Sequence, residues 1–165
     1  MVRVQKIIAK NFKSFAKTVE IPMDKGFNCI IGPNGSGKSN VADSMCFVLG
    51  KSSAKSMRAD KSANLIYNGG KNGSPSKQAE VSVVFDNHDN RFPIKGSTLK
   101  ITRTVKATGA SNYFINDEKR TRQQVVDLLR HAGVDPDGHN VILQGDIVRF
   151  MELKSEERRE LIEEI

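Results

Sequence analysis

The stretch GPNGSGKSN, residues 32–40, constrains this chain more than any other. The spacing from Gly32 to Gly37, Lys38 and Ser39 fits G-x-x-x-x-G-K-[ST], a phosphate-binding loop that joins a strand to a helix. Glycines let backbone N–H groups converge on phosphate oxygens, and the N-terminus of the following helix adds a favourable dipole. We therefore predict that the chain binds a nucleoside triphosphate.

Two side chains of this loop are predicted to carry chemistry. Lys38 is expected to neutralise the β and γ phosphates, and the Ser39 hydroxyl is expected to bind Mg²⁺. An accidental match in a Gly/Ser-rich loop is the alternative, and the apolar run before the loop and the helical pattern after it argue against it. The remaining predicted phosphate-cradle residues are Gly32, Pro33, Asn34, Gly35, Ser36 and Gly37, with Asn40 opening the helix behind them.

Length and composition indicate one globular domain. The 165 residues suffice to bury a core, and 38% are hydrophobic while 27% are charged. No run of eighteen apolar residues occurs, and residues 1–10 alternate charge with apolarity, unlike a signal peptide, so we expect an intracellular protein without a membrane partner. The net charge of +7 suggests a polyanionic partner, although solvated surface lysines account for it equally well.

The cysteines and histidines give no sign of a metal site. We expect Cys29 and Cys46 to be small buried hydrophobes, and neither a disulfide nor a metal pair. His88, His131 and His139 share no metal-ligand spacing with each other or with the cysteines, so no zinc site is predicted.

The first half of the chain is predicted to hold three strands and one helix. Residues 2–10, 18–23 and 27–31 have the pattern of short strands, and the last is continuously apolar, as expected of a strand covered on both faces. Apolar positions recur at helical spacing over 38–49, with Gly50 as a stop. Residues 51–78 are rich in Lys, Ser, Gly and Asn, which predicts a surface excursion and not a core element.

The second half is predicted to begin with antiparallel strands. Apolar residues alternate over 81–85 and, with Arg103 among them, over 99–105, so the opposite face, which carries Lys100, Thr102, Thr104 and Lys106, is expected to be wet. A capping box formed by Thr121 and Gln124 opens a helix that Gly133 closes. Residues 140–148 predict a buried strand or strand-loop, and Ser155 caps a charged helix that has no stop signal.

Asp86 is the candidate for a magnesium carboxylate within the chain. It ends the run VSVVFD, which is similar to the hydrophobic strand ending in aspartate that holds Mg²⁺ in many ATPases. The alternation of Val81, Ser82 and Val83 instead favours a half-exposed antiparallel strand that ends in a turn at DNHDN. We therefore predict that the magnesium carboxylate and the water-activating base lie outside these 165 residues.

Four segments together carry a resemblance to a known family. They are KNFKSF near the start, GPNGSGKSNVADSMCFVLG around the loop, RADK after it, and VILQGDIVRFMELKSEERRELIEEI at the end. The chain resembles the N-terminal half of the ATPase head of an SMC (structural maintenance of chromosomes) protein, of the prokaryotic condensin type. The resemblance implies an α/β fold of the ABC ATPase kind, with a mixed sheet around the phosphate-loop helix and an antiparallel β subdomain. It implies an N-terminal lobe over 1–154 and the root of a coiled coil over 155–165.

The resemblance also implies further site residues. Gln144 matches the family's Q-loop glutamine, which contacts Mg²⁺ and the attacking water, and Arg58 matches its R-loop arginine near the triphosphate. Lys13 and Ser14 are similar to residues that line the edge of the nucleotide. The implied catalytic residues are Lys38, Gln144 and Arg58, with ATP and Mg²⁺ bound.

The resemblance implies that function needs partners. In this family the signature motif and the Walker B carboxylate lie in a C-terminal half that folds back on the N-terminal one. A second head closes over the ATP, a kleisin subunit bridges the heads, and hydrolysis drives chromosome condensation and segregation in the cytoplasm. The fragment alone is then expected to bind ATP without efficient turnover. The lysines that could contact DNA, irrespective of its sequence, are Lys51, Lys55, Lys61, Lys71 and Lys77.

Three other functions fit parts of the sequence. A self-contained kinase or GTPase would use Asp86 for Mg²⁺, but the chain has no guanine-recognition motif or lid arginines. A DNA-binding module would carry a vestigial loop and would not bind ATP. A double-strand-break-repair ATPase head has the same plan, and the stretch after Lys38 and the last thirty or so residues favour the SMC type over it.

Overall fold

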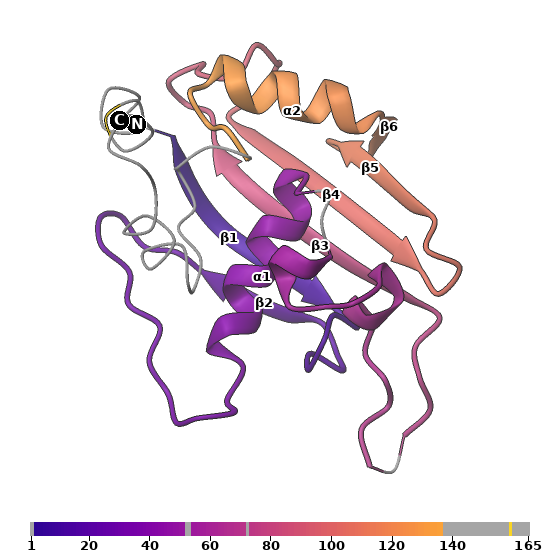
Figure 1. Ribbon diagram of the computed structural model, residues 1–165. Coiled ribbons are helices and arrows are strands. Elements are labelled where there is room, and N and C mark those ends of the chain that lie inside the picture. Colours follow the sequence, from indigo (N-terminus) through magenta and orange to yellow (C-terminus); the bar gives the residue numbers. More distant parts are fainter. Residues whose placement is uncertain (1, 52–53, 72, 137–158, 160–165) are drawn as a thin grey trace.

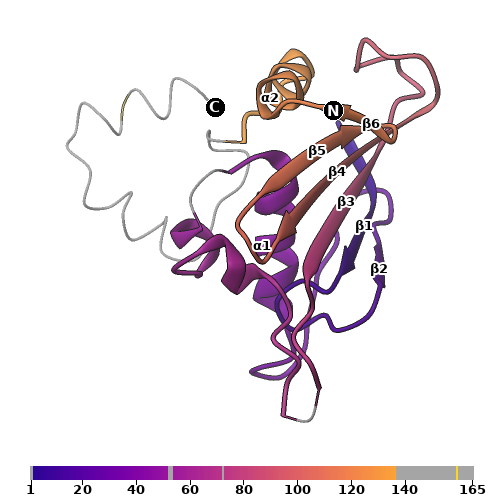
Figure 2. The same ribbon diagram turned by 90° about the vertical axis from the view of Figure 1, so that its right-hand side faces the viewer.

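The computed structural model describes residues 2–51, 54–71, 73–136 and 159 of the chain. Within these residues one sheet of six strands runs in the order β2-β1-β3-β4-β5-β6, and every neighbouring pair is antiparallel. The two helices lie over the same face of this sheet (Figure 1 and Figure 2). The elements are β1 (Arg3–Lys10), β2 (Val19–Pro22), α1 (Lys38–Leu49), the 3-10 turns η1 (Lys55–Met57) and η2 (Ser62–Leu65), β3 (Gln78–Asp86), β4 (Thr98–Lys106), β5 (Ser111–Ile115), β6 (Glu118–Arg120) and α2 (Arg122–His131).

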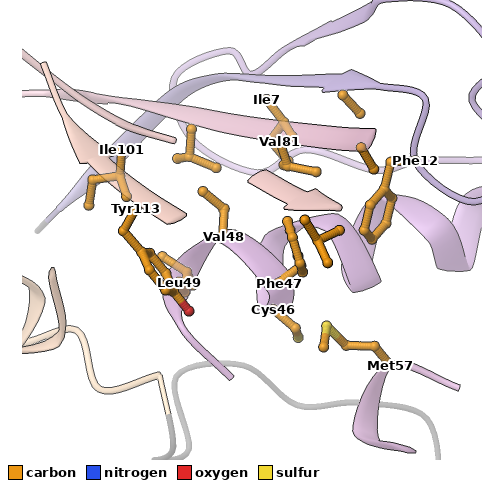
Figure 3. Packing of buried hydrophobic residues seen from close by; sticks show 14 of the residues in the cluster. Ile7, Phe12, Cys46, Phe47, Val48, Leu49, Met57, Val81, Ile101 and Tyr113 are labelled. Carbon is orange, nitrogen blue, oxygen red and sulfur yellow. The ribbon is translucent and has the colours of Figure 1, made fainter. Parts of the chain in front are cut away.

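The core lies between the sheet and α1. Ile7 on β1, Val83 on β3 and Ile101 on β4 are register partners, so their side chains line one face together. From α1, Phe47 and Val48 are fully buried within the same cluster (Figure 3). Each such side chain contributes about 1.5–3 kcal/mol through burial, so this packing holds the phosphate-loop helix against the sheet.

Most elements predicted from periodicity and capping are confirmed. The predicted helix over 38–49 is α1, and the strands over 2–10 and 18–23 are β1 and β2 within two residues at each end. The antiparallel pairing of the 81–85 and 99–105 strands is confirmed by β3 and β4. The capping box opens α2, because Thr121 Oγ1 accepts from Gln124 N at 3.2 Å and the Gln124 side chain accepts from Thr121 N.

The prediction of a strand over residues 27–31 is wrong for the part of the chain that the structure describes. No strand lies between Pro22 and Lys38, and Phe27 and Ile31 are 94% and 85% exposed. A continuously apolar strand is stable only when both its faces are covered, and no described element covers this one. The mixed part of the predicted sheet is therefore not formed by the described residues.

Residues 51–78 contribute to the core, contrary to the prediction of a surface excursion. Met57, Leu65 and Ile66 are buried in the same cluster as α1. Lys13 N donates to Leu65 O at 2.8 Å, and Tyr67 N donates to the carbonyl of Asn11 at 2.8 Å. The segment is thus tied to the turn that follows β1, and the short apolar island over 65–67 that interrupts its polar composition was the signal of this anchoring.

The second face of the sheet is less wet than predicted. Thr102 and Thr104 on β4 are buried, while Lys100 is half-buried and Lys106 is exposed. The Thr102 hydroxyl lies 2.7 Å from the hydroxyl of Ser82 on β3. The Ser82 and Thr102 hydroxyls therefore satisfy each other across the strands, which allows this polar pair to be buried.

Two predicted elements lie outside the described residues. These are the strand or strand-loop over 140–148, which contains Gln144, and the helix over 155–165 that was expected to begin a coiled coil. Both remain predictions.

Arg103 fixes the C-terminal end of α1 to the sheet. Its Nη1 donates to Phe47 O at 2.8 Å and to Lys51 O at 2.9 Å, and its Nε donates to Ser111 Oγ at 2.9 Å. The guanidinium also lies 4.3 Å from the centre of the Phe47 ring and 4.9 Å from that of Tyr113. Burial lowers the pKa of Arg103 below its usual value. A cation at the negative end of the helix dipole, with carbonyl partners, is favourable there.

We predict that Arg103→Ala lowers the free energy of unfolding by about 2–4 kcal/mol, because it removes the charged donor from the Phe47 and Lys51 carbonyl oxygens and from the Ser111 hydroxyl. Denaturant unfolding measures the change. Lys106→Ala, at an exposed site on the same strand, is the control and should stay within about 0.5 kcal/mol of the parent. Equal unfolding midpoints for the two variants would contradict this role of Arg103.

Candidate functional site

The phosphate loop is a tight turn at the start of α1. Gly35 and Gly37 have φ values of +81° and +96°, in the left-handed region. An L-residue pays roughly 1–2 kcal/mol in this conformation, which explains glycine at both positions. Ser36 N donates to Pro33 O at 3.2 Å and closes the turn. The sequence spacing thus corresponds to a formed loop.

Backbone donors collect at the N-terminus of α1. Gly37 is the N-cap and offers no side chain to satisfy them, and the first turn carries no acidic residue. The N–H groups of Lys38 and Ser39 have no acceptor within the helix, because the first residues of any α-helix lack one. With the helix dipole, these donors favour an anion such as a phosphate group.

The Lys38 side chain folds back over this loop. Its Nζ donates to the carbonyl oxygens of Gly32 at 2.6 Å and Pro33 at 2.8 Å. A phosphate oxygen would be a stronger acceptor for the ammonium than these neutral carbonyls. Ser39 is exposed beside it, so its hydroxyl is available to a ligand or cation.

Ser14, which the family resemblance assigns to the edge of the nucleotide, lies beside the loop, and its contact with a nucleotide stays a prediction. Asn40 Nδ2 donates to Ser14 Oγ at 2.7 Å. A Cβ built on Gly37 would lie 3.3 Å from the same oxygen, so the turn after β1 packs directly against the loop. Sequence segments 26 positions apart are thereby joined at one site.

Lys13 and Arg58 converge on Asp43, a residue that sequence reasoning missed. Lys13 Nζ donates to Asp43 Oδ2 and, at 2.8 Å, to Met57 O. Arg58 Nη2 donates to the same Asp43 oxygen at 2.5 Å, and the Asp43 side chain is only 4% exposed. The available signal was an acid in a predicted helix, four residues after Ser39 and four residues before Phe47.

A hollow of about 520 Å³ lies next to these residues. Lys13 and Ser14 form one side of it, and Ile66 and Tyr67 form another. It is open to solvent and is lined by both apolar and polar side chains.

Asp86 lies at the other end of β1 from this site. Its carboxylate contacts His88 Nδ1 at 2.5 Å and Arg3 Nη1 at 3.4 Å, and the hydrogen bonds from His88, with a smaller contribution from Arg3, lower its pKa. Asp86 is the register partner of Arg3, and the eight residues of β1 span roughly 23 Å before the turn that contains Ser14. Asp86 therefore cannot share a metal ion with Ser39, which agrees with its interpretation as a strand end.

The other predicted site residues have mixed outcomes. Gln144 lies outside the described residues. Of the five lysines proposed for DNA, Lys51 is half-buried and Lys55, Lys61, Lys71 and Lys77 are exposed, which leaves their DNA role a prediction. In the described ranges no three His, Cys, Asp or Glu residues lie close enough to hold a metal ion. No helix in these ranges has the length and apolarity needed to cross a membrane.

The cysteine prediction is half right. Cys46 is buried in α1, but Cys29 is exposed, because it belongs to the uncovered segment before the loop. Its burial was predicted from the strand that the described chain does not form.

A phosphate-binding loop beside an antiparallel sheet places this chain in the class of phosphate-loop nucleotide-binding proteins. Within that class, it belongs to the RecF/RecN/SMC N-terminal domain family, which it matches over residues 3–138.

Relatives and solved structures agree with this family. The chromosome partition protein Smc of Pyrococcus furiosus is 46% identical over 166 residues, covering 100% of this chain and 14% of that protein. The protein of the same name from Methanocaldococcus jannaschii is 43% identical over 175 residues, with the same two coverages of 100% and 14%. The chain therefore spans about one seventh of the length of these relatives.

Several solved structures match almost the whole chain. One, from work on the ATP-driven dimerization and DNA-stimulated activation of SMC ATPases, has a TM-score of 0.91 and 46% identity, covering 98% of both chains. Another is a Pyrococcus furiosus Smc head domain with an extended coiled coil, bound to the C-terminal domain of ScpA. It has a TM-score of 0.93 and 47% identity, covering 98% of this chain and 41% of that one. The predicted likeness to the N-terminal part of an SMC head is thus confirmed.

We predict that the two cysteines differ sharply in reactivity. Cys29 should react with Ellman's reagent as a free thiol does, because it is exposed, while Cys46 should react only after unfolding. Thiol release followed over time measures both. Cys29→Ser should remove the fast phase, and a fast phase that survives this change would contradict the exposure assigned to Cys29.

Proposed function

We propose that this chain forms the nucleotide-gripping part of an SMC-type ATPase head, with ATP as its ligand. The observation that carries the proposal is a phosphate loop that is fully formed while the apolar segment leading into it, residues 27–31, is uncovered. The loop accounts for the proposed binding of ATP. The uncovered segment indicates that a second part of the head is needed to cover it.

The exposure of residues 27–31 supports the proposal that the sheet is incomplete in this chain alone. Phe27 and Ile31 are exposed, and burial of each side chain would contribute about 1.5–3 kcal/mol of favourable free energy. The run has the composition of a strand enclosed on both faces, and the extended backbone of such a strand offers unpaired N–H and C=O groups to a neighbour. A C-terminal half that pairs here would add strands next to the phosphate loop, where a magnesium carboxylate and a catalytic base are needed.

The residues of this chain would then have separate tasks. The amide groups at the start of α1 and the Lys38 ammonium bind and orient the phosphates. The hydroxyl of Ser39 and the amide oxygen of Gln144 suit Mg²⁺, which prefers oxygen ligands and keeps part of its shell for phosphates and water. The metal supplies neutralisation of charge on the β and γ phosphates. Arg58, held beside α1, donates to phosphate oxygens whose charge rises in the transition state.

The proposed role in the cell rests on the relatives. Their descriptions name chromosome partition, ATP-driven dimerization, DNA-stimulated activation and binding of ScpA domains. We carry these over as a head that engages a second head around ATP, binds a kleisin subunit, and contacts DNA through phosphates irrespective of sequence. The protein would act on the chromosome in the cytoplasm.

Nucleotide binding tests the proposal directly. Lys38→Ala should abolish measurable binding of ATP in a calorimetric titration, because it removes the cation that meets the β and γ phosphates. Asp86→Asn is the matched control and should bind as the parent does, since Asp86 lies at the far end of β1. Unchanged affinity in Lys38→Ala, or loss of affinity in Asp86→Asn, would contradict the proposal.

Thiol modification tests whether the C-terminal part of the head covers residues 27–31. Addition of the C-terminal part of the head should slow modification of Cys29 by roughly tenfold or more, because pairing buries the segment. Buried Cys46 serves as the internal reference for unfolding. Equal modification rates with and without that part would show that it covers a different surface.

A further inference from the structure

Asp43 is a buried carboxylate on the phosphate-loop helix, and two cations share it. Its side chain is 4% exposed, and the side chains of Lys13 and Arg58 both donate to its Oδ2 atom. These cations come from the turn after β1 and from the segment after η1, which lie 30 and 15 positions away. A buried carboxylate is stable only when such partners compensate its charge.

The position of Asp43 places the two cations near the phosphates. Asp43 follows Ser39 by four residues, so both lie on one face of α1, about 6 Å apart along the helix axis. Lys13 also donates to Met57 O, which ties the turn after β1 to η1. The charged group therefore sits one helical turn behind the predicted metal ligand.

The backbone at both cations is held in an uncommon conformation. Lys13 and Arg58 have φ values of +49° and +54°, which non-glycine residues adopt infrequently. Such conformations persist where the surroundings fix them. The hydrogen bonds from Lys13 N to Leu65 O and from Arg58 N to Lys55 O hold the two turns, and Asp43 joins their side chains.

The two cations differ in the donors that they have left. Lys13 is 15% exposed, and its ammonium donates to Asp43 and to Met57 O. Arg58 is 42% exposed, and its bond to Asp43 uses one of the five N–H donors of a guanidinium. Arg58 can therefore stay bonded to Asp43 while it donates to a phosphate oxygen. Without Asp43, the neighbouring positive charges of Lys13 and Arg58 would repel each other.

We infer that Asp43 is a positioning residue that holds Arg58, with Lys13 as a fixed brace, beside the phosphate loop so that the guanidinium meets the phosphates of bound ATP. The inference rests on the proposed function, because it assigns Arg58 to the nucleotide. Asp43 itself touches neither nucleotide nor metal. Asp43 instead orients the Arg58 side chain and compensates the positive charges of Lys13 and Arg58.

A double-mutant cycle in the complete head tests the catalytic part. Asp43→Asn keeps the shape of the side chain but loses its charge, and should lower the rate of ATP turnover roughly tenfold to a hundredfold through misplacement of Arg58. Arg58→Ala should cause a loss of similar size, and the double variant should be no slower than Arg58→Ala alone. Asp43→Glu, which restores the charge, should recover part of the rate. Asp127→Asn, an exposed acid on α2, is the control and should not change it.

Hydrogen exchange tests the positioning independently of turnover. In Asp43→Asn, amides of residues 11–15 and 54–59 should exchange faster, while amides of β3 and β4 keep the protection of the parent. Faster exchange throughout the sheet would mean that Asp43 serves global stability and would contradict the inference, as would parent-like exchange in both turns.

The outcomes separate this inference from the proposed function. A parent head without turnover, or a Lys38→Ala head that retains it, would contradict the proposed function and with it the catalytic part, while the exchange measurement still decides the positioning. With an active parent, parent-like turnover in Asp43→Asn, or losses that multiply in the double variant, would overturn the inference alone.

Discussion

The attachment of α1 to the sheet is the interaction on which the rest of this structure depends. Its apolar side packs against the inner face of the central strands, and charged side chains fix it further. Arg103 binds carbonyl oxygens at the C-terminal end, and Asp43, at the middle of the helix, binds Lys13 and Arg58. These contacts determine where the first turn of α1, and hence the phosphate loop, lies relative to the rest of the chain.

The phosphate loop is formed, but the segment that leads into it is not covered. Lys38, Gly37 and Ser14 form a compact arrangement around the start of α1. The segment before it, residues 27–31, is exposed despite its apolar composition. The described chain thus has a place for phosphates, but Asp86 is at the other end of β1, and Asp43 is buried and bonded to Lys13 and Arg58, so neither carboxylate is placed to complete a metal site with Ser39. Such a division fits the proposed catalytic site, which is assembled from several parts.

Local patterns predicted α1, the phosphate loop and the capping box of α2, because their determinants lie within a few residues of each other. The burial of residues 27–31 was predicted wrongly, since an apolar run shows that a strand needs cover but not whether the described chain provides it. The β5–β6 hairpin carried a signal that was not used. Its turn residues Asn116 and Asp117 have φ values of +47° and +66°, as tight hairpin turns require.

The charged group around Asp43 could not be predicted from spacing, because its partners come from distant turns that only the folded chain brings together. The family resemblance pointed to Lys13 and Arg58 but not to the carboxylate that joins them. An acid one helical turn before Phe47 was the local sign of this arrangement, and it identifies neither partner.

The central claim is that these residues grip ATP but hold only part of the apparatus that hydrolyses it. The most direct measurement is the rate of phosphate release from ATP by this chain alone and by the same chain mixed with the C-terminal half of its head. We predict release only in the mixture. Sustained release from the 165-residue chain alone would contradict the account.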